Sequence, residues 1–245
     1  MNNYKLVIQY DGGRYKGWQR LGNGELTIQG KIESVLSELE GKPVEIIGAG
    51  RTDAGVHALE QIATFKSQKD VKESEIKKHL NRYLPQDISI VDVIKVHDRF
   101  HARYNAVNKT YVYKIWNEEY THPFMRKYSM HVKEKLDVQK MKEAATHFVG
   151  EHDFTAFSNA KSKKKSMVRT IHSLELIHND GFLEVRIRGN GFLYNMVRKI
   201  VGTLIEVGQG KVNAGSIPKA LQAKERSPGL MAEAQGLYLK TIEFE

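Results

Sequence analysis

The first hundred residues contain strand and helix patterns in the order β-α-β-β-α-β, and no other feature constrains the fold more. Residues 4–10 (YKLVIQY) alternate between apolar and polar side chains, as a half-buried strand does. Thr27 precedes a helical apolar pattern and Gly41 follows it, so the two residues mark a helix. The same reading predicts a second helix over 73–84, closed by a proline, and strands over 44–47, 61–66 and 88–96. This order is typical of ferredoxin-like α+β folds.

The second half repeats the alternation more loosely. The patterns predict strands over 110–116, 170–177, 182–188 and 238–244, and helices over 138–148, 195–207 and 216–223. The sequence Asn179-Asp180-Gly181 predicts a hairpin turn between the second and third of these strands. Because no linker rich in Pro, Gly or Ser separates the halves, we predict an α+β protein with halves 1–100 and 101–245. Both halves are expected to be ferredoxin-like (RRM-like), and to share a largely antiparallel central sheet with helices on one side and a cleft on the other.

The composition narrows the chemistry. The chain has 245 residues and no cysteine, which excludes disulfides, thiolate nucleophiles, iron–sulfur clusters and cysteine-based zinc sites. The formal charge of +9 favours a polyanionic partner, although a merely basic protein would show the same excess. No apolar run reaches the roughly 18 residues of a membrane span, so we expect a cytoplasmic protein with no membrane partner.

The stretch 48–58 (GAGRTDAGVHA) is the strongest candidate for a functional loop. Small residues surround one cation, Arg51, and one carboxylate, Asp53. The stretch lacks the third glycine of a dinucleotide fingerprint, and the sequence holds no phosphate-loop motif. Asp53 could form a turn or cap a helix, or it could carry the chemistry. A cation two residues away keeps a carboxylate ionised and able to act as a nucleophile or a base.

Residues 97–101 (HDRFH) have the i, i+4 histidine spacing of a zinc-binding helix. However, the pattern predicts that they continue the strand over 88–96, and Asp98 stands where such sites carry glutamate. We therefore predict no metal site here, and no cofactor elsewhere in the chain.

Three further features allow a structural and a functional interpretation. Tyr111 and Tyr113 point to the same side of a strand, either as sheet residues or as a stacking platform for a nucleobase. Arg198 borders the apolar stripe of its helix, either extending its charged end to water or pairing with a carboxylate in a cleft. The basic loop with Lys161, Lys163, Lys164 and Lys165 is either solvated or a phosphate contact.

Taken together, several blocks resemble the tRNA pseudouridine synthase A family over essentially the whole chain. The blocks are YDGGRYKGWQR (10–20), GAGRTDAGVHA (48–58), FHARY (100–104), KTYVY (109–113), GNGFLYNMVRKIVG (189–202) and GLYL (236–239). The resemblance implies an isomerase that forms pseudouridine at positions 38, 39 and 40 of the tRNA anticodon stem-loop. It also implies a homodimer in which one tRNA contacts both subunits.

The resemblance assigns roles to four residues. Asp53 would be the catalytic nucleophile, Tyr111 would stack on the target base and assist removal of the proton from C5, Arg198 would pair with Asp53, and Arg51 would lie near the displaced base. The isomerisation needs no redox partner and no energy input, in agreement with the missing nucleotide, thiol and metal signatures. A carboxylate can attack C1′ of the ribose or C6 of the uracil, or act as a base at C2′, and the residues do not choose among these.

Two departures from the family pattern bear on substrate choice. Glu60 stands where the family often has glycine, and Thr64 where it often has histidine. A paralogue with shifted uridine specificity would look like this. Two rival functions remain, a non-catalytic RNA-binding protein and a nucleoside hydrolase that cleaves the N-glycosidic bond.

Overall fold

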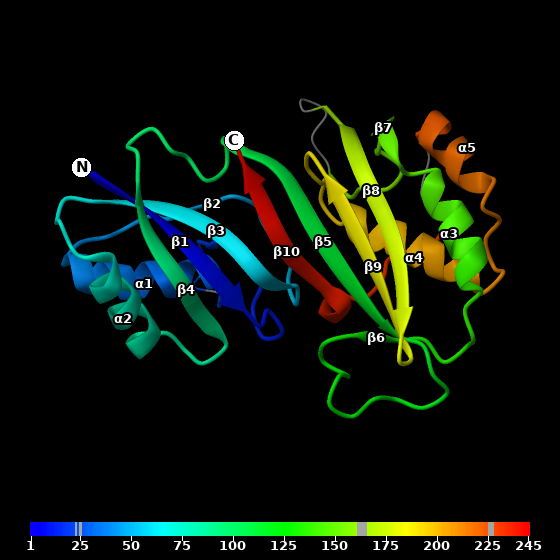
Figure 1. Cartoon of the computed structure of the whole chain (residues 1–245), viewed down its shortest axis with the longest axis horizontal. Helices are drawn as coiled ribbons and strands as arrows, with labels where there is room; N and C mark the ends of the chain where they lie inside the picture. The colour runs from blue at the N-terminus through cyan, green and yellow to red at the C-terminus, as the bar shows by residue number, and fades with distance from the viewer. Residues whose placement is uncertain (23, 25, 161–165, 225–227) are drawn as a thin grey trace. The chain divides into compact units, whose positions relative to one another are not determined.

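The computed structural model describes residues 1–22, 24, 26–160, 166–224 and 228–245. Helices and strands are mixed along the chain (Figure 1), which confirms the predicted combination of sheet and helices. The chain forms two compact units, Met1–Val107 with Tyr238–Glu245, and Asn108–Leu237. The ferredoxin-like description, the shared sheet with its cleft, and the domain limits at residue 100 stay predictions.

The first unit is built around a sheet with the strand order β4-β1-β3-β10. Its elements are β1 (Asn2–Tyr10), α1 (Ile28–Glu40), β2 (Ile47–Gly48), β3 (His57–Ser67), α2 (Glu73–Tyr83), β4 (Ile88–Val96) and β10 (Leu237–Phe244). Strand β1 pairs antiparallel with both β3 and β4, and the short β2 also pairs antiparallel with β3. Strand β10 runs parallel to β3, so residues 238 and 239 lie beside residues 57 and 58.

Helix α1 begins and ends at the predicted residues. The side-chain hydroxyl of Thr27 accepts the backbone N–H of Gly30, and Gly41 closes the helix with a left-handed φ of 73°. Its apolar face buries Ile28, Ile32 and Leu36 completely. Full burial of side chains of this size stabilises a fold by about 1.5–3 kcal/mol each, so this face anchors the helix.

The strand predicted over 44–47 was wrong, because only residues 47 and 48 pair as a strand. Side chains of α1 satisfy the backbone of the preceding residues instead. The N–H of Val44 donates to the hydroxyl of Ser37 at 2.9 Å, and the N–H of Ile46 donates to the carboxylate of Glu33 at 3.0 Å. The apolar side chains are buried as a strand pattern would require, but their hydrogen bonds go to a helix.

Residues 97–101 do not continue the strand as predicted, because β4 ends at Val96. A turn follows, in which the N–H of Phe100 donates to the carbonyl of His97 at 2.9 Å. Nδ1 of His97 accepts the N–H of Arg99, and Nδ1 of His101 accepts the N–H of Arg103. Within the described residues, no group of three or more histidine or acidic side chains is placed to hold a metal ion.

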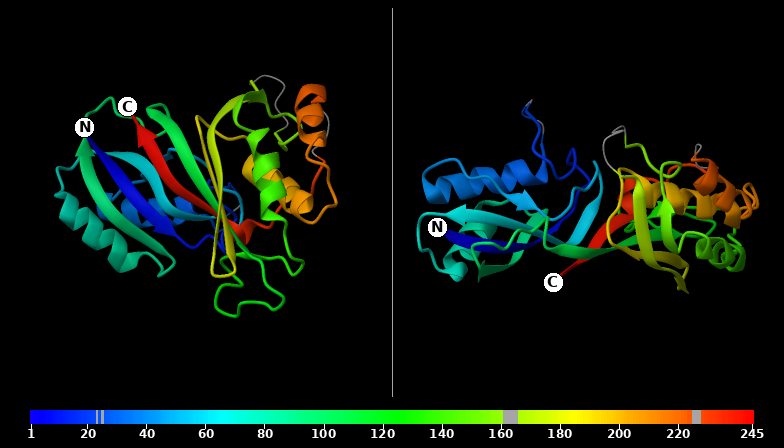
Figure 2. Two further views of the ribbon diagram at one scale, coloured as in Figure 1. Left: turned by 45° about the vertical axis from the view of Figure 1, so that its right-hand side comes forward. Right: turned by 90° about the horizontal axis from the view of Figure 1, so that it is seen from above.

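In the second unit the strand order is β5-β9-β8-β7, with β6 paired to β5. Figure 2 shows its helices grouped beside these strands. Its elements are β5 (Ala106–Trp116), β6 (Met130–His131), α3 (Val138–Thr146), β7 (Gly150–Asp153), β8 (Val168–Asn179), β9 (Phe182–Gly189), α4 (Met196–Gly208), α5 (Ser216–Ala223) and the 3-10 turn η1 (Ala234–Gly236). None of the helices in the described ranges has the length and apolar character that crossing a membrane requires.

The hairpin of β8 and β9 and the apolar face of α4 confirm two sequence predictions. Asp180 and Gly181 both have positive φ, 47° and 77°, as a two-residue hairpin turn of the favoured type requires. On α4, the predicted apolar stripe is buried throughout: Met196, Val197, Ile200, Val201 and Leu204. The stripe fixes which side of α4 faces the core, and it leaves Arg198 at its edge, half-buried.

Candidate active site

Asp53 lies in the loop between β2 and β3, where the chain turns sharply. The N–H of Val56 donates to the carbonyl of Asp53 at 3.2 Å, and Gly55 inside the turn has a φ of 79°. That φ favours glycine, which explains one of the small residues of the motif. Asp53 is half-buried and Arg51 is exposed. A carboxylate on such a turn is accessible to a substrate, and its backbone is held by its neighbours.

The segment 12–18 packs tightly against this loop. The N–H of Trp18 donates to the carbonyl of Thr52 at 3.0 Å, next to Asp53. A side chain at Gly12 would place its Cβ 1.9 Å from the carbonyl oxygen of Val56, and one at Gly17 would lie 2.6 Å from that of Thr52. Two backbones can approach this closely only through glycine. The glycine-rich motif near the start of the chain therefore supports the Asp53 loop, a role that was not predicted from the sequence.

Two side chains support the loop from the core. The hydroxyls of Tyr10 and Thr52 share a buried hydrogen bond of 2.8 Å. Burial raises the pKa of Tyr10 above its ordinary value, so the phenol stays neutral. The amide of Gln61 on β3 donates to the carbonyl of Gly50 at 2.9 Å. Both contacts restrain the loop within three residues of Asp53.

His57 is the last residue but one of the motif and connects the loop to β10. Its Nδ1 lies 3.0 Å from a carboxylate oxygen of Asp11 and 3.1 Å from the N–H of Gly12. The imidazole stacks on Tyr238 of β10 at a centroid distance of 4.9 Å. Sequence reasoning missed the roles of Asp11 and His57, although both lie within the motifs that carry the resemblance.

Tyr111 belongs to the second unit, on β5 opposite Ile187 of β9. Its ring meets that of Phe192 edge to face, with centroids 5.1 Å apart. Its neighbour Tyr113 is fully buried and donates its hydroxyl to the carbonyl of Glu233 at 2.7 Å. Tyr113 is therefore a core residue that ties β5 to the segment before β10. Tyr111 is buried as well, with 7% of its surface exposed, and its predicted stacking role stays a prediction.

Arg198 lies in the first turn of α4 and is oriented by two acceptors of the same unit. Its Nε donates to the carbonyl of Ala232 at 2.8 Å, and a terminal nitrogen donates to the side chain of Asn195 at 3.3 Å. The N–H of Ala232 donates back to the carbonyl of Arg198 at 3.0 Å. The two hydrogen bonds orient the guanidinium, and both acceptors are neutral groups.

The structure places Arg51 and Asp53 on one loop of the first unit, and Tyr111 and Arg198 in the second unit. The segment 192–198 brings the latter two into one network, since Phe192 contacts Tyr111 and Asn195 contacts Arg198. The predicted substrate-binding lysines, Lys161, Lys163, Lys164 and Lys165, lie outside the described residues.

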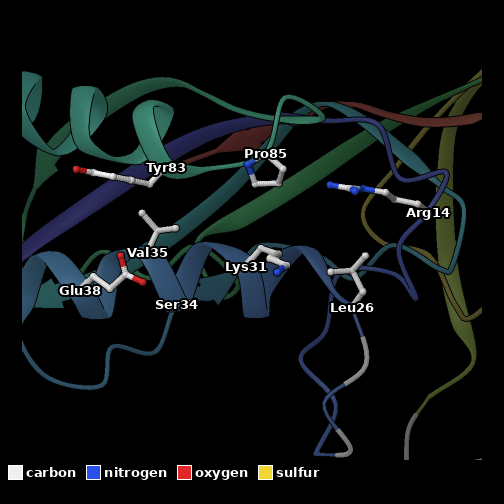
Figure 3. A pocket seen from close by; sticks show the side chains of 8 residues that line it. All are labelled: Arg14, Leu26, Lys31, Ser34, Val35, Glu38, Tyr83 and Pro85. Atoms are coloured by element: carbon white, nitrogen blue, oxygen red, sulfur yellow. The ribbon is translucent and has the colours of Figure 1, made fainter.

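A pocket of about 380 Å³ lies between α1 and α2 of the first unit, and none of the predicted site residues lines it (Figure 3). Its lining carries both charges, with Arg14 and Lys31 against Glu38. Arg14 is also paired with the carboxylate of Asp87. Because these charges compensate each other, the pocket has no electrostatic preference for a polyanion, and we do not assign it to the active site.

Known proteins identify the family of the chain. The sequence model of a family described as tRNA pseudouridine synthase matches residues 6–105 and 144–245. A Bacillus cereus protein named tRNA pseudouridine synthase A 2 is 67% identical, and the alignment covers 100% of both chains. A Clostridium tetani protein named tRNA pseudouridine synthase A 1 is 43% identical, again over 100% of both.

The chain belongs to the tRNA pseudouridine synthase family, and its activity is that of an isomerase, which confirms the resemblance in the sequence. Among solved structures, an archaeal box H/ACA sRNP Nop10–Cbf5 complex matches with a TM-score of 0.41 at 13% identity. That match covers 95% of this chain and 46% of the other chain, so the present chain spans less than half of that protein.

Proposed function

We propose that this isomerase forms pseudouridine at positions 38, 39 and 40 of the tRNA anticodon stem-loop, with Asp53 as the catalytic nucleophile. The observation that carries the proposal is the intact motif 48–58 on a loop whose backbone is fixed from three sides. A carboxylate that must meet one atom of a mobile substrate gains most from such a fixed position.

The proposed reaction is balanced without any co-reactant. The carboxylate of Asp53 bonds to C1′ of the ribose or to C6 of the uracil. The bond between N1 and C1′ breaks, the uracil rotates, C5 joins C1′, and the bond to Asp53 breaks again. The proton that leaves C5 goes to solvent, and N1 takes up a proton. The target base must first leave its stack, which costs a few kcal/mol. Stacking on Tyr111 and contacts of basic residues with phosphates offset this cost.

The remaining roles follow from charge and position. Arg198 is proposed to pair with Asp53 and to keep it ionised, since a nearby cation stabilises the charged form of a carboxylate. The exposed Arg51 is proposed to contact the substrate near the displaced base. Lys161, Lys163, Lys164 and Lys165 are proposed to contact tRNA phosphates.

Release of tritium from tRNA labelled at C5 of uridine tests the role of Asp53. Asp53→Asn and Asp53→Ala are expected to reduce the release to background while tRNA binding persists, because phosphate contacts dominate affinity. Asp70→Asn is a matched control, since Asp70 is an exposed carboxylate of the same unit that pairs with Lys95. Turnover by either Asp53 variant would refute the assignment.

The same system separates the alternative functions. A non-catalytic RNA-binding protein would bind tRNA and release no tritium, and a nucleoside hydrolase would release free uracil. Mapping pseudouridines in tRNA from cells with and without the protein tests the choice of positions 38, 39 and 40. Loss of pseudouridine elsewhere, with these three positions intact, would indicate the shifted specificity that Glu60 and Thr64 suggest.

We further propose that the protein acts in the cytoplasm as a homodimer. Light scattering on the purified protein, with and without tRNA, measures the oligomeric state directly. A monomer in the complex with tRNA would contradict a substrate that contacts both subunits.

A further inference from the structure

One short segment of the second unit joins the two residues proposed to act there. Within residues 190–195, Phe192 packs its ring against Tyr111 and Asn195 accepts a hydrogen bond from Arg198. Tyr194 lies between them, and 57% of its surface is exposed. The neighbouring Phe192 is half-buried and Asn195 is buried. Tyr194 is therefore the exposed aromatic side chain of this segment.

The backbone at Tyr194 is fixed although its ring is exposed. Its carbonyl oxygen accepts the N–H of Asn159 at 3.0 Å and the hydroxyl of Ser158 at 3.3 Å. Asn195 adopts a left-handed φ of 61°, a conformation that asparagine adopts more readily than most residues other than glycine. Two exchanged hydrogen bonds between Asn190 and Thr170 hold the start of the segment. An aromatic ring on such a backbone loses little entropy when it binds a partner.

Cations flank the segment. Arg169 packs along Gly191, where an added Cβ would lie 3.5 Å from its Nε. One terminal nitrogen of Arg169 donates to the carbonyls of Ser166 and Val168, which orient the guanidinium without neutralising it. Burial lowers the pKa of Arg169. Arginine nevertheless stays protonated near neutral pH, because its ordinary pKa lies far above it. Nζ of Lys199 donates to the carbonyl of Ser158 at 3.0 Å.

We propose that Tyr194 and Arg169 form an RNA contact beside the active site. The ring of Tyr194 stacks on a nucleobase next to the target uridine, and Arg169 binds the phosphate of that nucleotide. The inference rests on the proposed function. Stacking of a base on an aromatic side chain contributes about 1–3 kcal/mol, a magnitude similar to the cost of unstacking the target. Tyr194 thus acts as a positioning residue that replaces the lost stacking partner of the neighbouring base.

Exposure alone does not distinguish Tyr194, because single exposed tyrosines are common. Tyr120 is 76% exposed, yet it lies on a loop with the acidic Glu118 and Glu119 beside it. Tyr194 combines an exposed ring with a fixed backbone, flanking cations, and contacts of its neighbours with Tyr111 and Arg198. Tyr120 therefore serves as a matched control for the loss of an exposed aromatic ring.

The test compares Tyr194→Ala, Tyr194→Phe and Tyr120→Ala by tRNA affinity at fixed salt and by single-turnover tritium release. Loss of one stacking contact is expected to lower kcat/KM for Tyr194→Ala about 5- to 150-fold. Tyr194→Phe keeps the ring and is expected to stay within about twofold of the wild type, as is Tyr120→Ala. Arg169→Gln is expected to reduce the slope of log affinity against log salt by about one.

A structural effect would be recognised by the thermal midpoint, which is expected to be unchanged in the Tyr194 variants. An anticodon stem-loop with 5-bromouridine next to the target should form a photocrosslink at Tyr194. Wild-type values for Tyr194→Ala in both assays, or equal damage from Tyr194→Phe, would overturn the inference. If the wild-type protein formed no pseudouridine, the proposed function itself would be refuted. If only the inference about Tyr194 were wrong, the wild-type protein would still form pseudouridine and Tyr194→Ala would match it.

Discussion

The hydroxyl groups of Tyr10 and Thr52 lie 2.8 Å apart in the core of the first unit, and Thr52 directly precedes Asp53 in the sequence. Tyr10→Phe removes one partner and leaves a buried hydroxyl unsatisfied, which costs about 1–3 kcal/mol. We expect the variant to lose this stability and to lower kcat more than it raises KM, because the loop shifts. Urea unfolding and tritium release measure the two effects.

Tyr4→Phe is the matched control for this change. Tyr4 lies on the same strand and donates its hydroxyl to the carbonyl of Val71 at 2.8 Å, in a contact that involves no residue of the Asp53 loop. It should lose stability and keep its kcat. The pair Tyr10→Phe with Thr52→Val should recover most of the lost stability, since removal of both partners is nearly neutral. Equal kcat in the two tyrosine variants would argue against the support role.

Gly17 and Gly41 both have positive φ, 96° and 73°, but their surroundings differ. A Cβ at Gly17 would lie 2.6 Å from the carbonyl of Thr52, whereas no atom lies within 4 Å of one at Gly41. Gly41→Ala should be less stable than the wild type by about 1–2 kcal/mol, the strain of a left-handed conformation in a residue with a Cβ. Gly17→Ala should lose about 1–3 kcal/mol more of its free energy of unfolding, because the added Cβ overpacks the contact. It should also lower kcat. Equal stability and activity of the two variants would contradict this packing.

Arg198→Ala is expected to lower turnover more than tRNA affinity, because the proposed partner of the guanidinium is Asp53 and not a phosphate. Arg186→Ala is the control within the same unit, since Arg186 pairs with Glu184. Single-turnover rates and filter binding give the two quantities. An equal loss of turnover and of tRNA affinity would indicate that Arg198 contacts a phosphate and does not pair with Asp53.

Neutralising Lys161, Lys163, Lys164 and Lys165 should flatten the salt dependence of tRNA binding. Each lysine that contacts a phosphate contributes about one to the slope of log affinity against log salt. Replacing the exposed Lys77 and Lys78 of α2 controls for general loss of charge. An unchanged slope for the loop variant would indicate that these lysines are solvated and do not contact phosphates.

Stability should fall in alkaline solution. Burial and the carboxylate of Asp87 raise the pKa of Tyr15 from 10.0 to about 12. The stabilising contribution is complete below pH 10 and is lost as the pH rises towards 12, because the unfolded chain releases the proton first. Urea unfolding across this range should show a shallower decline for Tyr15→Phe than for the wild type. Tyr120→Phe should follow the wild type, and a Tyr15→Phe curve identical to it would contradict the assignment.

Periodicity predicted most elements well, because apolar stripes report directly which face is buried. Helix α1 between Thr27 and Gly41 and the stripe of α4 are examples. Periodicity failed at Val44 and Ile46, where buried apolar side chains coexist with hydrogen bonds to a helix. It also failed at His97, whose ring accepts a local N–H. Patterns of side chains do not show where backbone hydrogen bonds go.

For the candidate site, the motif in the sequence indicated Asp53, but it did not indicate the residues that hold the Asp53 loop in place. The approach of Gly17 to Thr52 and the stacking of His57 on Tyr238 join residues far apart in sequence. The pairing of β3 with β10 is likewise a long-range contact. A single sequence carries no signal for such distances, so the supporting residues came only from the structure.

The parallel pairing of β10 with β3 has a consequence for biosynthesis. It joins Tyr238 to His57 and Leu239 to Ala58, at the end of the Asp53 motif. A ribosome makes this partner strand only after the whole of residues 108–236. A nascent chain therefore carries the acid long before it carries the strand beside it, and we expect the growing polypeptide to remain inactive until that late segment emerges.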